Sequence, residues 1–256
     1  MRKFAISLTG AAFALAALST SASATALSYG GQNNGRANVM TTNSTALPNV
    51  NASAGPFTMN NTTAGGSFLA WCLDLYSYLA SGDYTELTGP FTGPNTGGNP
   101  NPFANSNDPS LTNLQLDKIE DLFEVNGTAV ETIYSTGNDS SNNIQAAGFQ
   151  LALWELIYET GPAYSLTGGT FQASPASAQK TSINSAANAF LGKLGGKVEF
   201  EYNLTFWENV TGTNQNLVSL SAPGTPVPSP VPLPAAGFLM IAGLAGLGAV
   251  ARRRKT

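Results

Sequence analysis

The 256-residue chain contains one thiol, that of Cys72, and no imidazole. A thiolate is a nucleophile, but without His there is no Ser/His/Asp triad, no Cys/His protease pair and no His-ligated zinc site. One Cys also cannot form an intramolecular disulfide or a four-cysteine metal site. Thiol chemistry is therefore confined to Cys72, which lies in the largely apolar segment 68–75.

Two segments together resemble the bacterial thioester domain of Gram-positive surface adhesins. That family combines a strand of the form aromatic-Cys-apolar-Asp with a helical apolar-Gln-x-x-apolar-Trp motif. Residues 71–74 (Trp-Cys-Leu-Asp) match the first pattern, and residues 149–154 (Phe-Gln-Leu-Ala-Leu-Trp) match the second. The resemblance covers residues 67–160 and implies an internal thioester between Cys72 and Gln150, formed with loss of ammonia.

The residues around these two positions suit such a bond. A thioester lasts only while water is kept away, and Trp71, Phe149 and Trp154 supply apolar neighbours. Trp154 follows Gln150 by one helical turn and shares its face. Asp74 is expected on the strand face that carries the cysteine, where it could orient or activate the site. Without His, proton transfer must use carboxylates, Tyr hydroxyls, the backbone or water, so we expect single-use capture of an amine or hydroxyl and no enzymatic turnover.

The same residues allow a plainer interpretation. A lone buried Cys is usually a small hydrophobic residue, and Gln150 could merely be hydrogen-bonded beside it. In an exported protein a free thiol is prone to oxidation or intermolecular pairing, which a thioester would prevent. Two hypotheses remain open: an adhesin-like protein that captures a nucleophile on a surface or polymer, and a non-covalent structural protein of a biofilm matrix with an inert Cys72.

Other candidate sites are weaker. Residues 105–108 offer oxygen ligands but lack the spacing of a calcium loop. Glu199 and Glu201 share a face of an expected strand, but nothing beside them indicates the sugar cleft that a glycosidase needs. We expect no metal site and no cofactor.

Strands and helices alternate in an order that predicts the α+β class. Two-residue alternation and polar turns predict strands at residues 25–29, 37–41, 56–60, 67–75, 197–207 and 216–221. Helical spacing predicts helices that start near residue 116, span 143–159 and span 177–194, with Asn126-Gly127 ending the first. Residues 89–109 are predicted to form a long loop. The order favours an antiparallel β-sandwich or barrel-like body with an inserted helical subdomain, in one ectodomain of residues 25–221.

Both ends of the chain carry targeting patterns. Residues 1–24 combine a basic start, an apolar stretch and a small-x-small cleavage site, which is typical of a secretory signal peptide. Residues 222–234 form a Pro-rich spacer. Residues 235–256 are an apolar segment followed by a basic tail, which predicts a C-terminal transmembrane helix.

The start of that C-terminal region resembles the PEP-CTERM sorting signal in its VPLPA variant. The motif is carried by Val231, Pro232, Leu233, Pro234 and Ala235. Leu233 stands where the namesake motif has Glu, which the variant permits. The resemblance implies export through the Sec pathway, transient anchoring in the inner membrane of a Gram-negative bacterium, and processing by an exosortase-type enzyme. The product would then reach the cell surface or the extracellular matrix.

Charge separates the middle of the chain from its ends. Only 10% of residues are charged, against ~25% in an ordinary domain. Between the basic ends, five Lys or Arg side chains accompany all 15 Asp and Glu, a net charge of −10. Such a surface repels phosphate backbones, so no nucleic-acid partner is expected.

Overall fold

The computed structural model describes residues 24–32, 37–41, 51–75, 77–88, 111–135, 140–161, 163–175, 178–196 and 202–221. The chain divides into two units, residues 1–220 and 221–256. Residues 1–23 of the expected signal peptide, the loop at 89–109, the Pro-rich spacer and the C-terminal sorting segment all lie outside the described residues. Within the described ranges, no helix is both long enough and apolar enough to cross a membrane.

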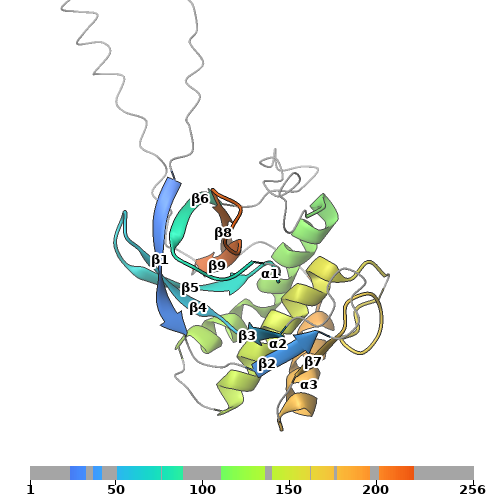
Figure 1. Ribbon diagram of the computed structural model, residues 1–256. Helices are drawn as coiled ribbons and strands as arrows, with labels where there is room; N and C mark the ends of the chain where they lie inside the picture. The colour runs from blue at the N-terminus through green and yellow to red at the C-terminus, as the bar shows by residue number, and fades with distance from the viewer. Residues whose placement is uncertain are drawn as a thin grey trace, which may run out of the picture. The chain divides into compact units, whose positions relative to one another are not determined.

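Six strands close into an antiparallel barrel in the order β1-β4-β5-β9-β8-β6 (Figure 1). They are β1 (Ala24–Gln32), β4 (Phe57–Asn61), β5 (Ser67–Cys72), β6 (Gly82–Thr88), β8 (Asn203–Asn209) and β9 (Leu217–Ser221). A separate three-stranded sheet has the order β3-β2-β7. Its strands are β2 (Ala37–Thr41), β3 (Asn51–Ala54) and β7 (Ala173–Pro175).

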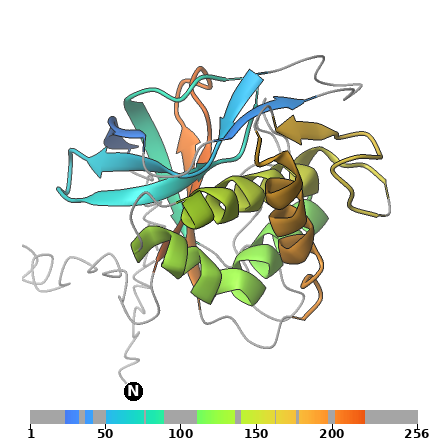
Figure 2. The same cartoon turned by 90° about the horizontal axis from the view of Figure 1, so that it is seen from below.

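Three helices gather on one side of the barrel (Figures 1 and 2). They are α1 (Asn113–Ser135), α2 (Ser140–Tyr158) and α3 (Lys180–Leu191). Helix α2 is buried on all sides from Ala146 to Ile157. A helix enclosed in this way needs apolar residues around its whole circumference, which explains the almost unbroken apolar run that contains Gln150.

A glycine allows α3 to pack closely on α2. A Cβ atom at Gly148 would lie 2.7 Å from the Cβ of Ala186 and 3.0 Å from the main-chain nitrogen of Ala187. Glycine costs about 1 kcal/mol within a helix, but here it permits the two backbones to approach. The fixed position of α2 then determines where Gln150, two residues further on, can reach.

An aromatic cluster connects α2 to the strand that carries the cysteine. The ring centroid of Phe149 lies 4.7 Å from that of Trp71 on β5, 4.9 Å from Phe123 on α1 and 5.3 Å from Phe190 on α3. All four side chains are buried. Aromatic pairs at these separations stabilise a core beyond the area they bury, so β5 and α2 are held in fixed register at the site.

The predicted α+β class with a barrel-like body and helices inserted between strands is confirmed. The predicted end of the first helix is wrong, because α1 continues through Asn126-Gly127 to Ser135. The Asn126 side chain donates to the carbonyl oxygens of Leu122 and Phe190. Tertiary packing thus overrides a local stop signal.

Other differences are smaller: β5 ends at Cys72, where the prediction ran to residue 75, and β3 and β7 were not predicted. Strand β6 is not among the predicted strands, because only Tyr84 of its side chains is fully buried and the alternation is weak. Strand β8 ends at Asn209, two residues later than predicted. Glu199, Glu201 and the 105–108 turn lie outside the described residues.

Candidate functional site

The cysteine lies where three elements meet. Cys72 is the last residue of β5, Gln150 comes from the middle of α2, and Gln215 precedes β9. Cys72 is 1% exposed and Gln150 is fully buried. The fold therefore brings together the two residues that the sequence singled out, and adds a second glutamine.

The Gln150 side chain binds the main chain of Cys72 through both of its polar groups. The N–H of Cys72 donates to Gln150 Oε1 at 3.1 Å, and Gln150 Nε2 donates to the Cys72 carbonyl oxygen at 2.8 Å. Both main-chain groups of Cys72 are buried, where water cannot reach them. The Gln150 amide therefore satisfies two groups that would otherwise lack a hydrogen-bond partner.

The arrangement of the strands explains why the main chain of Cys72 hydrogen-bonds to a side chain and not to a neighbouring strand. Leu73 N–H donates to the carbonyl oxygen of Asn216, so Trp71 and Leu73 turn their main-chain groups toward β9. Those of Cys72 then point to the opposite side, toward β4. Strand β4 begins at Phe57, which pairs with Ala70. The Gln150 amide thus takes the place of a neighbouring strand beyond the point where β4 starts.

The Cys72 sulfur contacts Gln215. Its Sγ lies 2.7 Å from Gln215 Oε1, and Gln215 Nε2 donates to the Asp74 carbonyl oxygen at 2.9 Å. Since a carbonyl bond is ~1.2 Å long, the Sγ atom lies at most about 3.9 Å from the Gln215 amide carbon. The amide is oriented at both ends, with its oxygen on the thiol and its nitrogen directed away from it.

Asp74 fixes the segment that carries this glutamine. Its buried carboxylate accepts from Asn216 N–H at 2.8 Å and from Ser77 N–H at 3.0 Å. Hydrogen bonds to a carboxylate are stronger than those between neutral groups. Asp74 was expected to orient or activate the site, and its contacts are those of an orienting residue.

The predicted aromatic neighbours are all buried. Trp71 packs on Phe149, and its indole N–H donates to the Tyr134 hydroxyl at 2.9 Å. Trp154 is 1% exposed, and its indole nitrogen has no hydrogen-bond partner among the described residues. These three rings form part of the water-excluding core around the end of β5.

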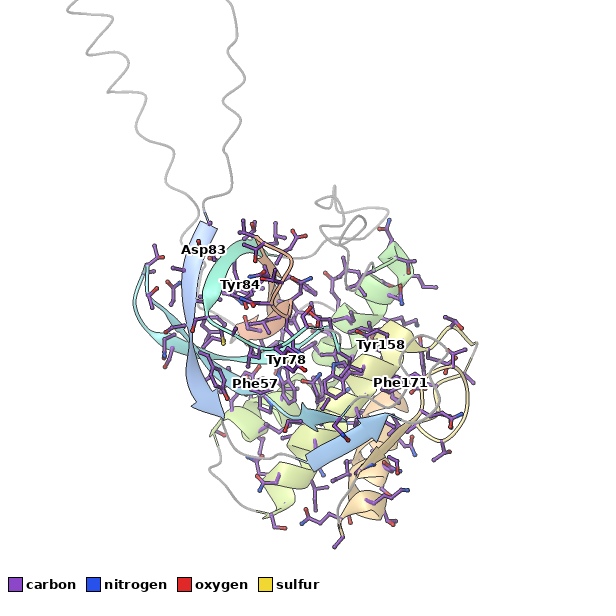
Figure 3. All side chains as sticks on the ribbon, viewed as in Figure 1. Phe57, Tyr78, Asp83, Tyr84, Tyr158 and Phe171 are labelled. Carbon is purple, nitrogen blue, oxygen red and sulfur yellow. The ribbon has the colours of Figure 1, made fainter. Side chains whose placement is uncertain are left out.

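Tyr84 is a further group beside the thiol that the sequence did not suggest. Burial raises the pKa of the Tyr84 hydroxyl, and the nearby Cys72 and Asp74 raise that pKa further. The phenol therefore keeps its proton, which it donates to the Ala80 carbonyl oxygen at 3.1 Å. Figure 3 shows Tyr84 on β6, on the barrel side of the molecule.

Gln215 was not predicted as a site residue from the sequence. It lies directly before the predicted strand 216–221, in a polar segment that shows no motif of its own. The sequence predicted the strand at 216–221 but not its pairing with the strand that carries Cys72, which only the structure shows. In the part of the chain that the structure describes, no group of three or more His, Cys, Asp or Glu side chains could hold a metal ion.

Glu155 is a buried acid on α2. Its Oε1 accepts from Ser165 N–H at 2.5 Å, and its Oε2 has no hydrogen-bond partner among the described residues. Burial raises the pKa of Glu155 from 4.5 to about 7; the Ser165 N–H lowers this pKa in part, and the nearby Glu159 carboxylate raises it. Glu155 therefore stays protonated in the folded protein over a pH range in which it ionises in the unfolded chain.

We expect Glu155 to reduce stability as pH rises. Between pH 4.5 and 7 the unfolded chain loses the Glu155 proton while the folded protein retains it, so the free energy of unfolding falls with pH in this window. The loss should be about 2 kcal/mol by pH 8, and the Glu155→Gln variant should lack it. Urea unfolding of both proteins at pH 5 and pH 8 isolates this difference, because their other carboxyl groups are the same. Equal losses in the two proteins would contradict the assignment.

Among known proteins, this chain is similar to several solved structures but matches no sequence family. No protein-family profile matches the sequence, and no curated protein is found similar to it. The N-terminal thioester domain of the fibronectin-binding protein SfbI from Streptococcus pyogenes has a TM-score of 0.42 at 15% identity, covering 72% of this chain and 92% of that one. The N-terminal domain of the Streptococcus pyogenes pilus tip adhesin Cpa has a TM-score of 0.43 at 15% identity, covering 76% and 98%.

A third similar structure is the N-terminal thioester domain of a surface protein from Clostridium perfringens. Its TM-score is 0.38 at 9% identity, and the match covers 72% of this chain and 97% of that one. Two of the three are thus thioester domains, and the third is a domain of an adhesin. The chemistry of the present site is inferred from its own geometry.

Proposed function

We propose that this protein is an adhesin-like protein of a bacterial surface or extracellular matrix that captures a nucleophile through an internal thioester. The bond joins Cys72 to Gln215, and Gln150 positions the cysteine. The observation that carries the proposal is the 2.7 Å contact between the buried Cys72 Sγ and Gln215 Oε1, in which the Gln215 amide is oriented at both ends.

The choice between the two glutamines follows from the geometry of a strand. Main-chain N–H and C=O groups lie in the plane of a sheet, whereas side chains project out of it. The Gln150 amide binds the main chain of Cys72, and so lies in that plane beside the strand. The Gln215 amide meets the sulfur itself. This favours Gln215 over the Cys72–Gln150 bond that the family resemblance implies.

The proposed reaction needs only groups of the chain. The Cys72 thiolate attacks the amide carbon of Gln215, the carbon–nitrogen bond breaks, and the nitrogen leaves as ammonia with the proton of the thiol. The product is an acyl thioester between Sγ and the former amide carbon. An incoming primary amine then attacks this carbon, forms an amide bond and releases the Cys72 thiol. Each molecule therefore captures one nucleophile and does not turn over.

Burial supports the persistence of such a bond. Cys72 is 1% exposed, and Trp71 and Leu73 beside it are fully buried. Water has little access to the sulfur, which slows hydrolysis of the acyl group. Gln215 is only partly buried and lies directly before β9.

The rest of the proposal concerns location and rests on the sequence. The signal peptide of residues 1–24 would direct export, and the VPLPA motif at residues 231–235 would direct processing by an exosortase-type enzyme after transient anchoring in the inner membrane. The nucleophile would then belong to a protein or polysaccharide outside the cell.

Mass spectrometry of the purified full-length protein tests the proposal. The intact mass should be lower by one ammonia than the mass calculated for the chain as purified, with its termini located by peptide mapping, and methylamine should restore mass by adding one methylamine. Fragmentation after methylamine treatment should locate the label on Gln215. A label on Gln150 would overturn the assignment of the bond, and a chain with its full mass and no labelling would overturn the thioester.

The alternative is a non-covalent structural protein of a biofilm matrix. It is favoured by the depth of Cys72, since a 1% exposed thiol can be a core residue whose sulfur merely donates to Gln215 Oε1. In that case the protein keeps its full mass, and Cys72 reacts with a maleimide only after unfolding.

A further inference from the structure

The turn that leads to Gln215 is exposed and polar. Residues 210–213, which follow β8, are all exposed, and between Val210 and Gln215 the turn contains only Thr, Gly and Asn. A turn of this composition gains little from apolar burial, so its conformation depends on its hydrogen bonds. Those hydrogen bonds therefore decide how well Gln215 is held against the buried sulfur of Cys72.

Asn209, the last residue of β8, organises this turn with its side chain. The side chain is buried (5% exposed), and its Oδ1 accepts from Thr211 Oγ1 at 2.8 Å. The same oxygen accepts from the main-chain N–H groups of Thr213 and Asn214 at 3.1 and 3.2 Å. One buried oxygen thus binds three residues of an otherwise exposed turn.

Asn209 is also fixed to the barrel and to the start of β9. Its Nδ2 donates to the carbonyl oxygen of Asp83 on β6 at 3.2 Å (Figure 3). Its main-chain N–H donates to Asn216 Oδ1 at 2.8 Å. Since Asn214 also binds Asn209, both sequence neighbours of Gln215 are bound to this one residue.

The position of the Gln215 main chain matters because acylation is sensitive to distance. The Cys72 sulfur lies at most about 3.9 Å from the Gln215 amide carbon. Reacting atoms must come within ~3–3.5 Å of each other, and a misplacement of ~1 Å can slow a reaction about 100-fold. A loosened turn would let the amide carbon move away from the sulfur.

We propose that Asn209 is a positioning residue for formation of the thioester. It holds the main chain on both sides of Gln215, and so keeps the amide carbon within reach of the Cys72 sulfur. Asn209 takes part in none of the bond changes, because the thiol proton still leaves with the ammonia. This inference rests on the proposed thioester between Cys72 and Gln215.

The two steps of the proposed chemistry should depend on Asn209 differently. Before the bond exists, only the fold holds the amide carbon beside the sulfur. Once the bond exists, the bond itself holds the acyl carbon, so attack by a small amine should no longer need Asn209. A merely structural role would show no such difference between the two steps.

The test measures both steps on the full-length protein. Ammonia opens the thioester, which restores the Gln215 amide and the Cys72 thiol, and removal of the ammonia then allows the bond to form again. Intact mass follows this re-formation as the loss of one ammonia. The rate of methylamine addition to the formed thioester is measured separately, and urea unfolding shows which variants fold.

The variants are Asn209→Ala, Asn209→Asp and, as a control, Ser219→Ala. Ser219 is a buried residue of β9 that accepts from Trp207 Nε1 of β8 at 2.9 Å and lies outside the turn. Its replacement removes a buried hydrogen bond from the same pair of strands without touching the residues that hold Gln215.

We expect Asn209→Ala to slow re-formation of the thioester about 10- to 100-fold and not to slow methylamine addition. Asn209→Asp should re-form the bond faster than Asn209→Ala, because a carboxylate oxygen can accept from the same three donors. Ser219→Ala should unfold at lower urea but re-form the bond at the wild-type rate.

Four results would overturn the inference. They are a folded Asn209→Ala that re-forms the bond at the wild-type rate, equal slowing of both steps in that variant, an Asn209→Asp no faster than Asn209→Ala, and the same slowing in Ser219→Ala. A wild type that keeps its full mass and takes up no methylamine would instead refute the proposed thioester itself, and this inference with it.

A milder variant covers the case in which Asn209→Ala does not fold. Thr211 is exposed, and Thr211→Val removes one of the three hydrogen bonds to Asn209 Oδ1 while keeping the shape of the side chain. We expect this variant to fold and to re-form the thioester about 2- to 10-fold more slowly than the wild type. Re-formation at the wild-type rate would count against the inference.

Discussion

Replacing Gln215 by Glu will abolish the loss of ammonia completely. A carboxylate carries its negative charge on its two oxygens, which makes its carbon a poor electrophile, and it has no amine leaving group, so it cannot acylate the Cys72 thiolate. The side chain keeps its length and one oxygen can still meet the Cys72 sulfur, but the hydrogen bond from Gln215 Nε2 to the Asp74 carbonyl oxygen is lost, so urea unfolding of the variant is measured alongside to show that it folds. Intact mass should equal the sequence mass, methylamine should not add, and Cys72 should react with a maleimide once the chain is unfolded.

A matched control keeps this result specific. Gln172 lies in a loop and is only partly buried, and its Nε2 donates to the Gly169 carbonyl oxygen. Gln172→Glu makes the same chemical change away from the sulfur, and it should lose ammonia as the wild type does. Continued loss of ammonia in Gln215→Glu would exclude Gln215 as the acyl donor and return the assignment to Gln150.

Replacing Gln150 by Leu will destabilise the protein by about 2–5 kcal/mol, because it leaves two buried main-chain groups unsatisfied. Both the N–H and the C=O of Cys72 bond to the Gln150 amide, at 3.1 and 2.8 Å. Leu is similar in size and apolar, so the cost arises from the lost hydrogen bonds and not from a cavity. Urea unfolding measures it, with Gln145→Leu, an exposed position of the same helix, as the control.

The same variant separates the roles of the two glutamines. If Gln150 positions the cysteine, the folded fraction of Gln150→Leu should still lose ammonia, more slowly than the wild type, and a methylamine label should appear on Gln215. Unchanged stability in Gln150→Leu would contradict the main-chain role. Complete loss of acylation in a stable variant would instead identify Gln150 as the acyl donor.

These two predictions depend on one feature of the fold. The end of β5 lies between the Gln150 side chain, which takes the place of a neighbouring strand, and the turn before β9, which carries Gln215. Gln150 binds the cysteine backbone, Gln215 binds the sulfur, and Asp74 holds the turn by accepting from Asn216 N–H. Each of these three residues makes a different contact. A variant of Gln150 therefore tests the positioning of the cysteine backbone, and a variant of Gln215 tests formation of the thioester.

Much of the architecture was accessible from local pattern. The apolar run of α2 and the strand around Cys72 are visible in the sequence because burial imposes composition and periodicity on a single segment. The α+β class followed from the order of such segments. The extension of α1 beyond Asn126-Gly127 was not accessible, because Asn126 is held by the Phe190 carbonyl oxygen of a helix 64 positions away.

The candidate site likewise has features that the sequence predicted and features that only the tertiary structure shows. The sequence by itself determined that one thiol must do any thiol chemistry, that no imidazole assists it, and that Gln150 lies in an apolar helix, while the nearness of Gln150 to Cys72 was implied only by the family resemblance. Only the tertiary structure decided which amide meets the sulfur, since Cys72 and Gln215 are 143 positions apart. The reason is physical: residue type and spacing specify which groups are available, but the plane of the sheet separates the glutamine that binds the backbone from the one that meets the side chain.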